Sequence, residues 1–204
     1  MKFLKGLTLL LTVAVIANVL VYAGFNTNVA LLSAKSSDLK QNAFYMWMFY
    51  QHIFAGSIAL IMGVIQLIFT LKKMRAHKHI GRLYVFGVAL SGVSGTYIAI
   101  YANTGFMAQL GFFLLGILWL FTTSKALYHI LKGNRELHRQ WITRSMALTF
   151  AAITLRIWLP MGLMSGLDFN TVYPYIAWLC WVPNLLVAEL FFVNTIKIRR
   201  SLQH

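Results

Sequence analysis

Histidine and arginine side chains at the ends of long apolar segments are the residues of this chain with the clearest chemical potential. His79 and His138 each stand at the start of such a segment, so they could approach one ligand from two helices. Imidazole nitrogens are common axial ligands of haem iron. Arg82 and Arg144 lie close enough in the sequence to neutralise haem propionates. These four residues are therefore a candidate cofactor-binding site for haem b.

A second candidate site, for a ligand, lies inside the predicted bundle. His52 and Gln66 share one helix face with small residues, so both should point inward. At about 1.5 Å per residue, His52 and Arg156 each lie about 9 Å from the outer ends of their segments, in the layer of Tyr97. Ionisable side chains within a bilayer are costly and commonly functional, so this group is a candidate ligand-binding site. The alternative is that Arg156 snorkels outward and His52 hydrogen-bonds a backbone carbonyl.

Glu189 is the one acidic residue in the interior of a predicted membrane segment. It lies about 12 Å from Lys197 along the helix, too deep for its short side chain to reach water. Arg144 is its expected partner, and Arg82 is the second choice. We favour a structural ion pair over a proton-carrying carboxyl group, and Glu189 joins the candidate ligand-binding residues.

Several kinds of site are excluded or disfavoured by the composition. A single cysteine, Cys180, permits neither an intramolecular disulfide nor a cysteine-based metal centre. His77 and His79 are two residues apart and point to different faces of a helix, so we expect no metal site. With only four acidic residues and no Gly-x-Ser-x-Gly, His-Glu-x-x-His or phosphate-binding glycine motif, hydrolytic catalysis is disfavoured. Whether the protein is an enzyme stays open at this point.

The composition indicates an integral membrane protein. Of the 204 residues 59% are hydrophobic and 11% are charged, whereas soluble domains carry roughly 25% charged residues. The mean hydropathy is +0.70 and the net charge is +14. The basic residues stand at the ends of apolar runs rather than on one exposed face, which argues against nucleic acid as a partner.

Six hydrophobic stretches are close to the roughly 20 residues that span a bilayer. They cover residues 6–25, 46–71, 82–102, 106–128, 142–162 and 173–196. The first stretch is longer than the roughly 7–15 residues of a signal-peptide core, so we interpret it as an uncleaved span. The connecting loops are short, and the sequence therefore predicts one transmembrane domain over residues 1–204, an all-α six-helix bundle.

Lys and Arg are distributed unevenly between the two sides of this predicted bundle. Most of the 18 basic residues flank the segments on the side that also holds both termini. Positively charged loops stay in the cytoplasm, so both termini are predicted to be cytoplasmic, with the protein in the bacterial inner membrane. The same basic rim would attract the anionic lipids of the bilayer.

The segment from His138 to Arg156, HRQWITRSMALTFAAITLR, resembles the signature of the bacterial membrane proteins catalogued as domain of unknown function 2306 (DUF2306). The resemblance covers roughly residues 45 to 160 and, loosely, the whole chain, with a departure at Met146, where an aromatic residue is common. It implies a multi-span integral membrane protein and carries no activity with it. The residues that the motif singles out are His52, Gln66, Arg75, His79, Gly81, Arg82, Tyr84, His138, Trp141, Arg144 and Arg156.

Three functions fit these residues. The leading hypothesis is a haem-binding or redox-related membrane protein that uses the four cofactor-site residues. One alternative is a carrier or binder of a small anionic or lipid-like molecule, with Arg144 and Arg156 as anion contacts. Another is a non-catalytic accessory or assembly factor for a partner membrane complex. The sequence leaves the choice among them, the ligand and the oligomeric state open.

Overall fold

Helices make up all of the regular structure in the described part of the chain. The computed structural model describes residues 2–22, 24, 30–68 and 74–194. Its helices are α1 (Lys2–Leu20), α2 (Ala30–Ser33), α3 (Ser37–Gln41), α4 (Ala43–Ile68), α5 (Met74–Ala99), α6 (Phe106–Leu131), α7 (Arg135–Thr149), α8 (Ala151–Met164), α9 (Phe169–Leu179), α10 (Val182–Val187) and the π-helix η1 (Ala188–Val193). The prediction of an all-α fold is confirmed.

Four helical segments are long and apolar enough to cross a membrane. They are Ala43–Ile68, Phe106–Leu131, Arg135–Met164 and Phe169–Val193, and they coincide with four of the six predicted spans. The apolar part of α1, Lys5–Leu20, is shorter than these segments. Helix α5 starts at Met74, about two turns before the span predicted from residue 82, because its basic first turns are helical as well. Of the six predicted spans, the structure thus confirms four as helices long and apolar enough to cross a membrane.

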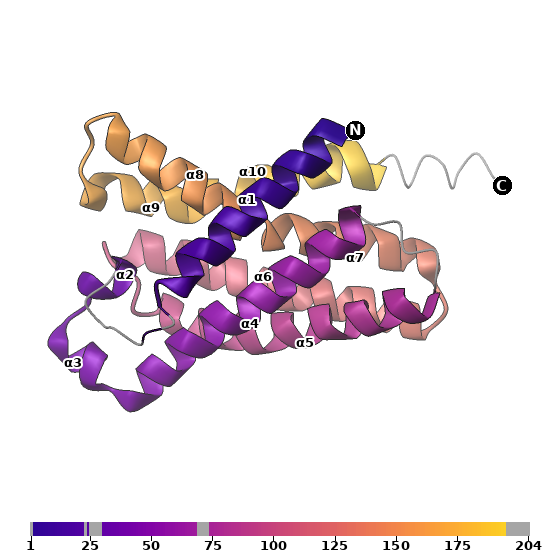
Figure 1. The fold of residues 1–204 in the computed structure, drawn as a ribbon, viewed down its shortest axis with the longest axis horizontal. Coiled ribbons are helices and arrows are strands. Elements are labelled where there is room, and N and C mark those ends of the chain that lie inside the picture. The colour runs from indigo at the N-terminus through magenta and orange to yellow at the C-terminus, as the bar shows by residue number, and fades with distance from the viewer. Residues whose placement is uncertain (1, 23, 25–29, 69–73, 195–204) are drawn as a thin grey trace.

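Three long helices, α4, α5 and α6, lie side by side with alternating directions (Figure 1). Helix α7 packs on α6 and is continued by α8, which forms a hairpin with α9. Helix α1 crosses α4 and contacts α8. The start of α1 and the end of η1 lie at the end of the molecule where α5 begins and α6 turns into α7 (Figure 1).

The α4–α5 contact depends on small residues. A Cβ atom at Gly87 of α5 would lie 2.9 Å from the backbone carbonyl oxygen of Ala55 and 3.2 Å from the Cβ of Ala59, so only glycine permits this approach. The α4 stripe predicted from the sequence does face the interior, since Gly56 meets Ser91 of α5 in the same way. Close backbone approach between small residues is the usual mode of helix association in lipid.

The main apolar core lies where α4, α5, α6, α7 and α9 meet. Its buried members are Ala59, Tyr84, Val88, Trp119, Leu148, Ala151, Cys180 and Trp181. The thiol of Cys180 is thus a core side chain. Large apolar side chains elsewhere are exposed, among them Phe106 and Phe121 of α6, as expected of a surface in contact with lipid.

The helical segment Phe169–Val193 is interrupted between α9 and α10. Pro183 stands at the start of α10, where its missing N–H is tolerated. The carbonyl of Cys180 instead accepts hydrogen bonds from two side chains, Asn184 Nδ2 at 2.9 Å and Thr154 Oγ1 of α8. The break therefore fixes the position of α10 and η1 against α7 and α8.

Candidate functional site

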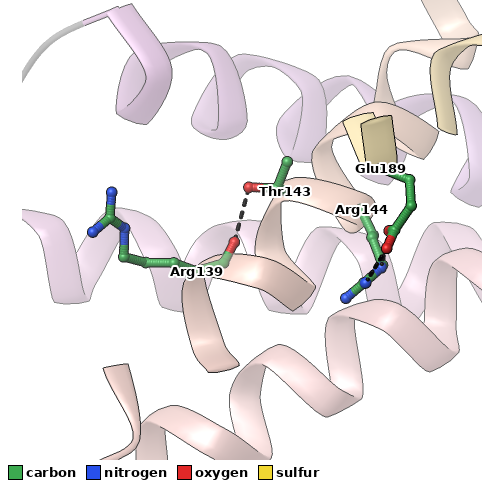
Figure 2. Close-up of polar contacts among 4 residues, drawn as sticks. All are labelled: Arg139, Thr143, Arg144 and Glu189. Atoms are coloured by element: carbon green, nitrogen blue, oxygen red, sulfur yellow. Dashed lines mark hydrogen bonds and ion pairs between the residues drawn. The ribbon is translucent and has the colours of Figure 1, made fainter. Parts of the chain in front are cut away.

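An ion pair joins α7 to the C-terminal helical segment. Arg144 Nε donates to Glu189 Oε2 at 2.8 Å, and Arg144 Nη2 donates to Glu189 Oε1 at 2.9 Å (Figure 2). The Arg144 guanidinium also lies over the Trp141 ring, 4.6 Å from its centroid. The predicted pairing of Glu189 with Arg144 is confirmed, whereas the second choice, Arg82, is exposed on α5.

Arg144 and Glu189 each lie in a distinct local structure. Arg144 lies in the middle of α7, whose N-terminus is capped by the Asn134 side chain, which accepts from Leu137 N at 3.0 Å. Glu189 lies in the π-helix η1, and π-turns are common at functional sites. Figure 2 shows the side chain of Arg139 extending away from the pair, although its carbonyl accepts a hydrogen bond from Thr143 Oγ1 at 2.8 Å.

The ion pair is the charged part of an apolar cleft of about 340 Å³, which we call the α6–α7–α10 cleft. Its lining residues are Leu118, Phe121, Thr122, Trp141, Arg144, Trp181, Val182, Leu185, Leu186 and Glu189. Phe121 and Leu186 are exposed on the outside of the helices, so the cleft opens on the apolar surface. A volume of this size lies near the lower limit of small-molecule sites, roughly 300–1,000 Å³.

At the other candidate site, the side chain of His52 of α4 packs against α5. Its Nδ1 lies 2.9 Å from the carbonyl oxygen of Ser91, and Ser91 Oγ donates to the carbonyl of His52 at 2.9 Å. A Cβ at Gly95 would be 2.7 Å from His52 Nδ1, so the imidazole lies directly on the α5 backbone. The alternative expectation, that His52 hydrogen-bonds a carbonyl, is confirmed.

Arg156 of α8 lies near this histidine. The guanidinium and the His52 imidazole are close enough to interact electrostatically, and Tyr22 at the end of α1 interacts with Arg156 in the same way. Arg156 Nη1 donates to the carbonyl of Ala152 at 2.9 Å, one turn earlier in its own helix. The Nε atom is buried and has no hydrogen-bond partner in the described part of the chain.

The other two members of this predicted group make contacts of their own. Gln66 is near the opposite end of α4, where its Nε2 donates to the carbonyl of His77 at 3.1 Å. Tyr97 packs in an aromatic cluster, with ring centroids 5.1 Å from Phe44 and 5.5 Å from Tyr101. Among the described residues, His52 and Arg156 interact electrostatically without a hydrogen bond between them, and Gln66 lies about 21 Å from His52 along α4.

The two histidines proposed as haem ligands do not face each other. His79 is exposed on α5, and its position is roughly 140° around the helix from the buried Tyr84, which points into the core. His138 Nδ1 lies 2.9 Å from the carbonyl oxygen of Ala126 on α6. The residues present thus do not fit a haem held between these two imidazoles. In the described residues, no group of three or more His, Cys, Asp or Glu side chains could hold a metal ion.

A buried network of hydroxyl groups connects α5, α6 and α7, and no sequence pattern predicts it. Thr149 Oγ1 donates to the carbonyl of Ser145 at 2.9 Å, so it accepts from Trp119 Nε1 at 2.9 Å and from the Tyr84 hydroxyl at 2.8 Å. The Tyr84 hydroxyl in turn accepts from Ser145 Oγ at 2.5 Å. Ser145 Oγ also lies 2.6 Å from Thr123 Oγ1, which donates to the carbonyl of Trp119 at 2.8 Å. This network satisfies its members and is a structural clamp.

The chain belongs to the family described as predicted membrane protein (DUF2306), whose model matches residues 49–192. The matched region contains both arginine sites and the α6–α7–α10 cleft. No curated protein and no solved structure matches the chain. The class of protein is thus a helical membrane protein with several apolar helices, and the family brings no activity with it.

Proposed function

We propose that this membrane protein binds a lipid-like amphiphile in the α6–α7–α10 cleft. The observation that carries the proposal is the bidentate Arg144–Glu189 pair at an otherwise apolar cleft. Sites for small molecules are mostly apolar and contain a few polar groups that fix the orientation of the ligand. Here the apolar part of a ligand would contact Trp181 and Leu185, and its polar head would lie against the ion pair.

The charge of the pair favours an uncharged head group. Arg144 uses two of its five N–H donors for Glu189, and the two charges neutralise each other. A carboxylate ligand would be repelled by Glu189, whereas a hydroxyl or carbonyl group can accept from the remaining Arg144 donors. Because the cleft opens beside exposed apolar residues of α6 and α10, the ligand would enter from the bilayer.

We also propose that six segments cross the bacterial inner membrane with both termini in the cytoplasm. The directions of the helices support this, since α4 and α6 both run toward the basic end of the molecule, so α5 must return between them (Figure 1). The charged residues of α5 lie in its first turns, at this basic end, and its remainder from residue 83 onward is uncharged. The basic end would then face the anionic lipids of the cytoplasmic leaflet.

The test of the cleft uses Leu185→Trp, which fills it, and Leu190→Trp as a matched control, because Leu190 is exposed and outside the lining. Lipids that copurify with the protein in mild detergent are extracted and quantified by mass spectrometry. We expect a retained amphiphile in the wild type and the control, and its loss in Leu185→Trp. If a Leu185→Trp protein with normal thermal stability retains the same lipid, the proposal is wrong.

Haem b, with His138 as its single imidazole ligand instead of the His79–His138 pair, remains a second candidate because of the orientation of His138. The Ala126 carbonyl only accepts, so His138 Nδ1 carries the proton and Nε2 is the atom that could ligate iron. A reduced-minus-oxidised spectrum of the purified protein tests this, with His138→Ala and His79→Ala as variants. A b-type spectrum that His138→Ala abolishes would support it, and a colourless protein that does not change with added haemin would exclude it.

A further inference from the structure

Arg156 differs from Arg144, the other arginine within the described apolar segments, because no carboxylate among the described residues forms an ion pair with it. Its buried Nε has no hydrogen-bond partner, and its hydrogen bond to the described residues comes from Nη1 alone. Guanidinium stays protonated in proteins, so Arg156 cannot become neutral as a buried lysine can. A charged group at such a position is expensive unless a counter-ion is present.

No acidic side chain of the chain serves as this counter-ion. The protein has four acidic residues, and all four lie in the described part. Glu189 binds Arg144, and Asp168 caps α9 by accepting from Thr171 N at 3.2 Å. Asp38 and Glu136 are in the first turns of α3 and α7. Among the described residues, the only ion pair is the one between Arg144 and Glu189.

The Arg144–Glu189 pair indicates which chemical group could pair with Arg156. The Nε and Nη2 atoms of Arg144 hold the two oxygens of one carboxylate at 2.8 and 2.9 Å. In Arg156 the Nε atom on the same edge of the guanidinium is unused. This planar edge matches the two oxygens of a carboxylate or phosphate, which it binds with two parallel hydrogen bonds.

His52, which neighbours Arg156, brings no negative charge to this position. Its Nδ1 faces a carbonyl oxygen, so it carries the proton of a neutral ring. Ile157 and Trp158, the next two residues of α8, are exposed apolar side chains. Arg156 is eight residues from the end of α8 at Met164, which is about 12 Å. An anion at this depth would need an apolar tail.

We infer that Arg156 anchors a second binding site, separate from the α6–α7–α10 cleft, for an amphiphile whose head is a carboxylate or a phosphate. The charge of this head completes the coordination of the guanidinium. The inference does not rest on the proposed function, since it concerns another helix, another arginine and a ligand with an anionic instead of an uncharged head. The free carboxylate of a fatty acid and the phosphate of a phospholipid are the two sources of such a head.

The experiment measures thermal unfolding of the full-length protein in a neutral detergent by its tryptophan fluorescence. Palmitate and phosphatidic acid are the two anionic probes, and hexadecanol and diacylglycerol are their uncharged counterparts. We expect at least one anionic probe to raise the Tm, while its uncharged counterpart has no effect. A response to palmitate alone identifies a carboxylate head, and a response to phosphatidic acid alone identifies a phosphate head.

Variants locate the effect. In Arg156→Gln the concentration of the anionic probe that gives half of the maximal increase in Tm should rise about tenfold or more, because charge-assisted hydrogen bonds are lost. Arg156→Lys keeps the charge without the planar edge and should respond weakly, which provides a second variant if Arg156→Gln does not fold. Arg139→Gln is the control, since the side chain of Arg139 is exposed. Leu185→Trp should respond as the wild type does, which separates this site from the cleft.

Two results would overturn the inference. In one, the anionic probes stabilise the wild type no more than their uncharged counterparts. In the other, Arg156→Gln and Arg139→Gln respond alike. Neither result bears on the lipid retained in the cleft.

Discussion

Two arginines within apolar helical segments, Arg144 and Arg156, have opposite environments. Arg144 is neutralised by Glu189, and Arg156 has no carboxylate partner in the described chain. The sequence predicted the first pair because an acidic and a basic side chain in apolar segments each need a partner. It could not predict that Arg156 would be left without one, because that depends on how α8 packs against α1 and α4.

Removing one member of the ion pair should have unequal effects. In Arg144→Ala the Glu189 carboxylate loses its partner, whereas Glu189→Gln leaves a neutral amide that can still accept from Arg144. Loss of a fully buried pair costs about 3–5 kcal/mol, and the partial exposure of Glu189 reduces the expected cost of Arg144→Ala to about 1–3 kcal/mol. Thermal unfolding in detergent measures both variants, and Arg82→Ala is the control. Equal losses for Arg82→Ala and Arg144→Ala would contradict the assignment.

The hydroxyl network makes a second prediction for single residues. Tyr84→Phe removes the donor to Thr149 and the acceptor for Ser145 in a buried site, so it should cost about 1–3 kcal/mol of unfolding free energy. Tyr175→Phe is the matched control because Tyr175 is 67% exposed. A lower Tm for both variants, or for neither, would show that the network does not clamp the helices. Hydroxyl residues carry no sequence signal that distinguishes such a network from helix capping, which is why it was missed.

The order, type and approximate limits of the long helices could be predicted from apolar segment length. Their ends could not, because α5 continues through the basic residues Arg75 and Lys78, which segment length assigns to a loop. The break after Cys180 and the π-helix at Glu189 were also missed. Both depend on contacts between elements, such as the one from Thr154 of α8 to the Cys180 carbonyl, and these have no local pattern.

One contact between elements makes the stability depend on pH. Lys35, between α2 and α3, donates to the Tyr101 carbonyl and to Asn103 Oδ1 at 2.7 Å, after the end of α5. Burial lowers the pKa of Lys35 from 10.5 to about 8. Between these values the unfolded chain binds more protons than the folded one, so stability rises as the pH increases from about 8 to 10.5.

The measurement for Lys35 compares unfolding of the wild type and Lys35→Met across this pH range. The wild type should gain up to about 1 kcal/mol relative to the variant, a small effect because water screens a partly exposed ammonium. Parallel pH profiles of the two proteins would mean that the amino group is not desolvated by folding.

At the scale of the whole molecule, the alternation of helix directions makes the topology testable. The start of α1 and the end of η1 lie at the basic end, which requires an even number of crossings (Figure 1). Most basic residues lie at this end, so it should be cytoplasmic.

A green fluorescent protein fused after His204 should therefore be fluorescent, and alkaline phosphatase at the same position should be inactive. Phosphatase inserted at Gly166, in the turn between α8 and α9, should be active. Active phosphatase after His204 would reverse the orientation, and it would place the Arg144 cleft in the outer leaflet and the Arg156 site in the inner one.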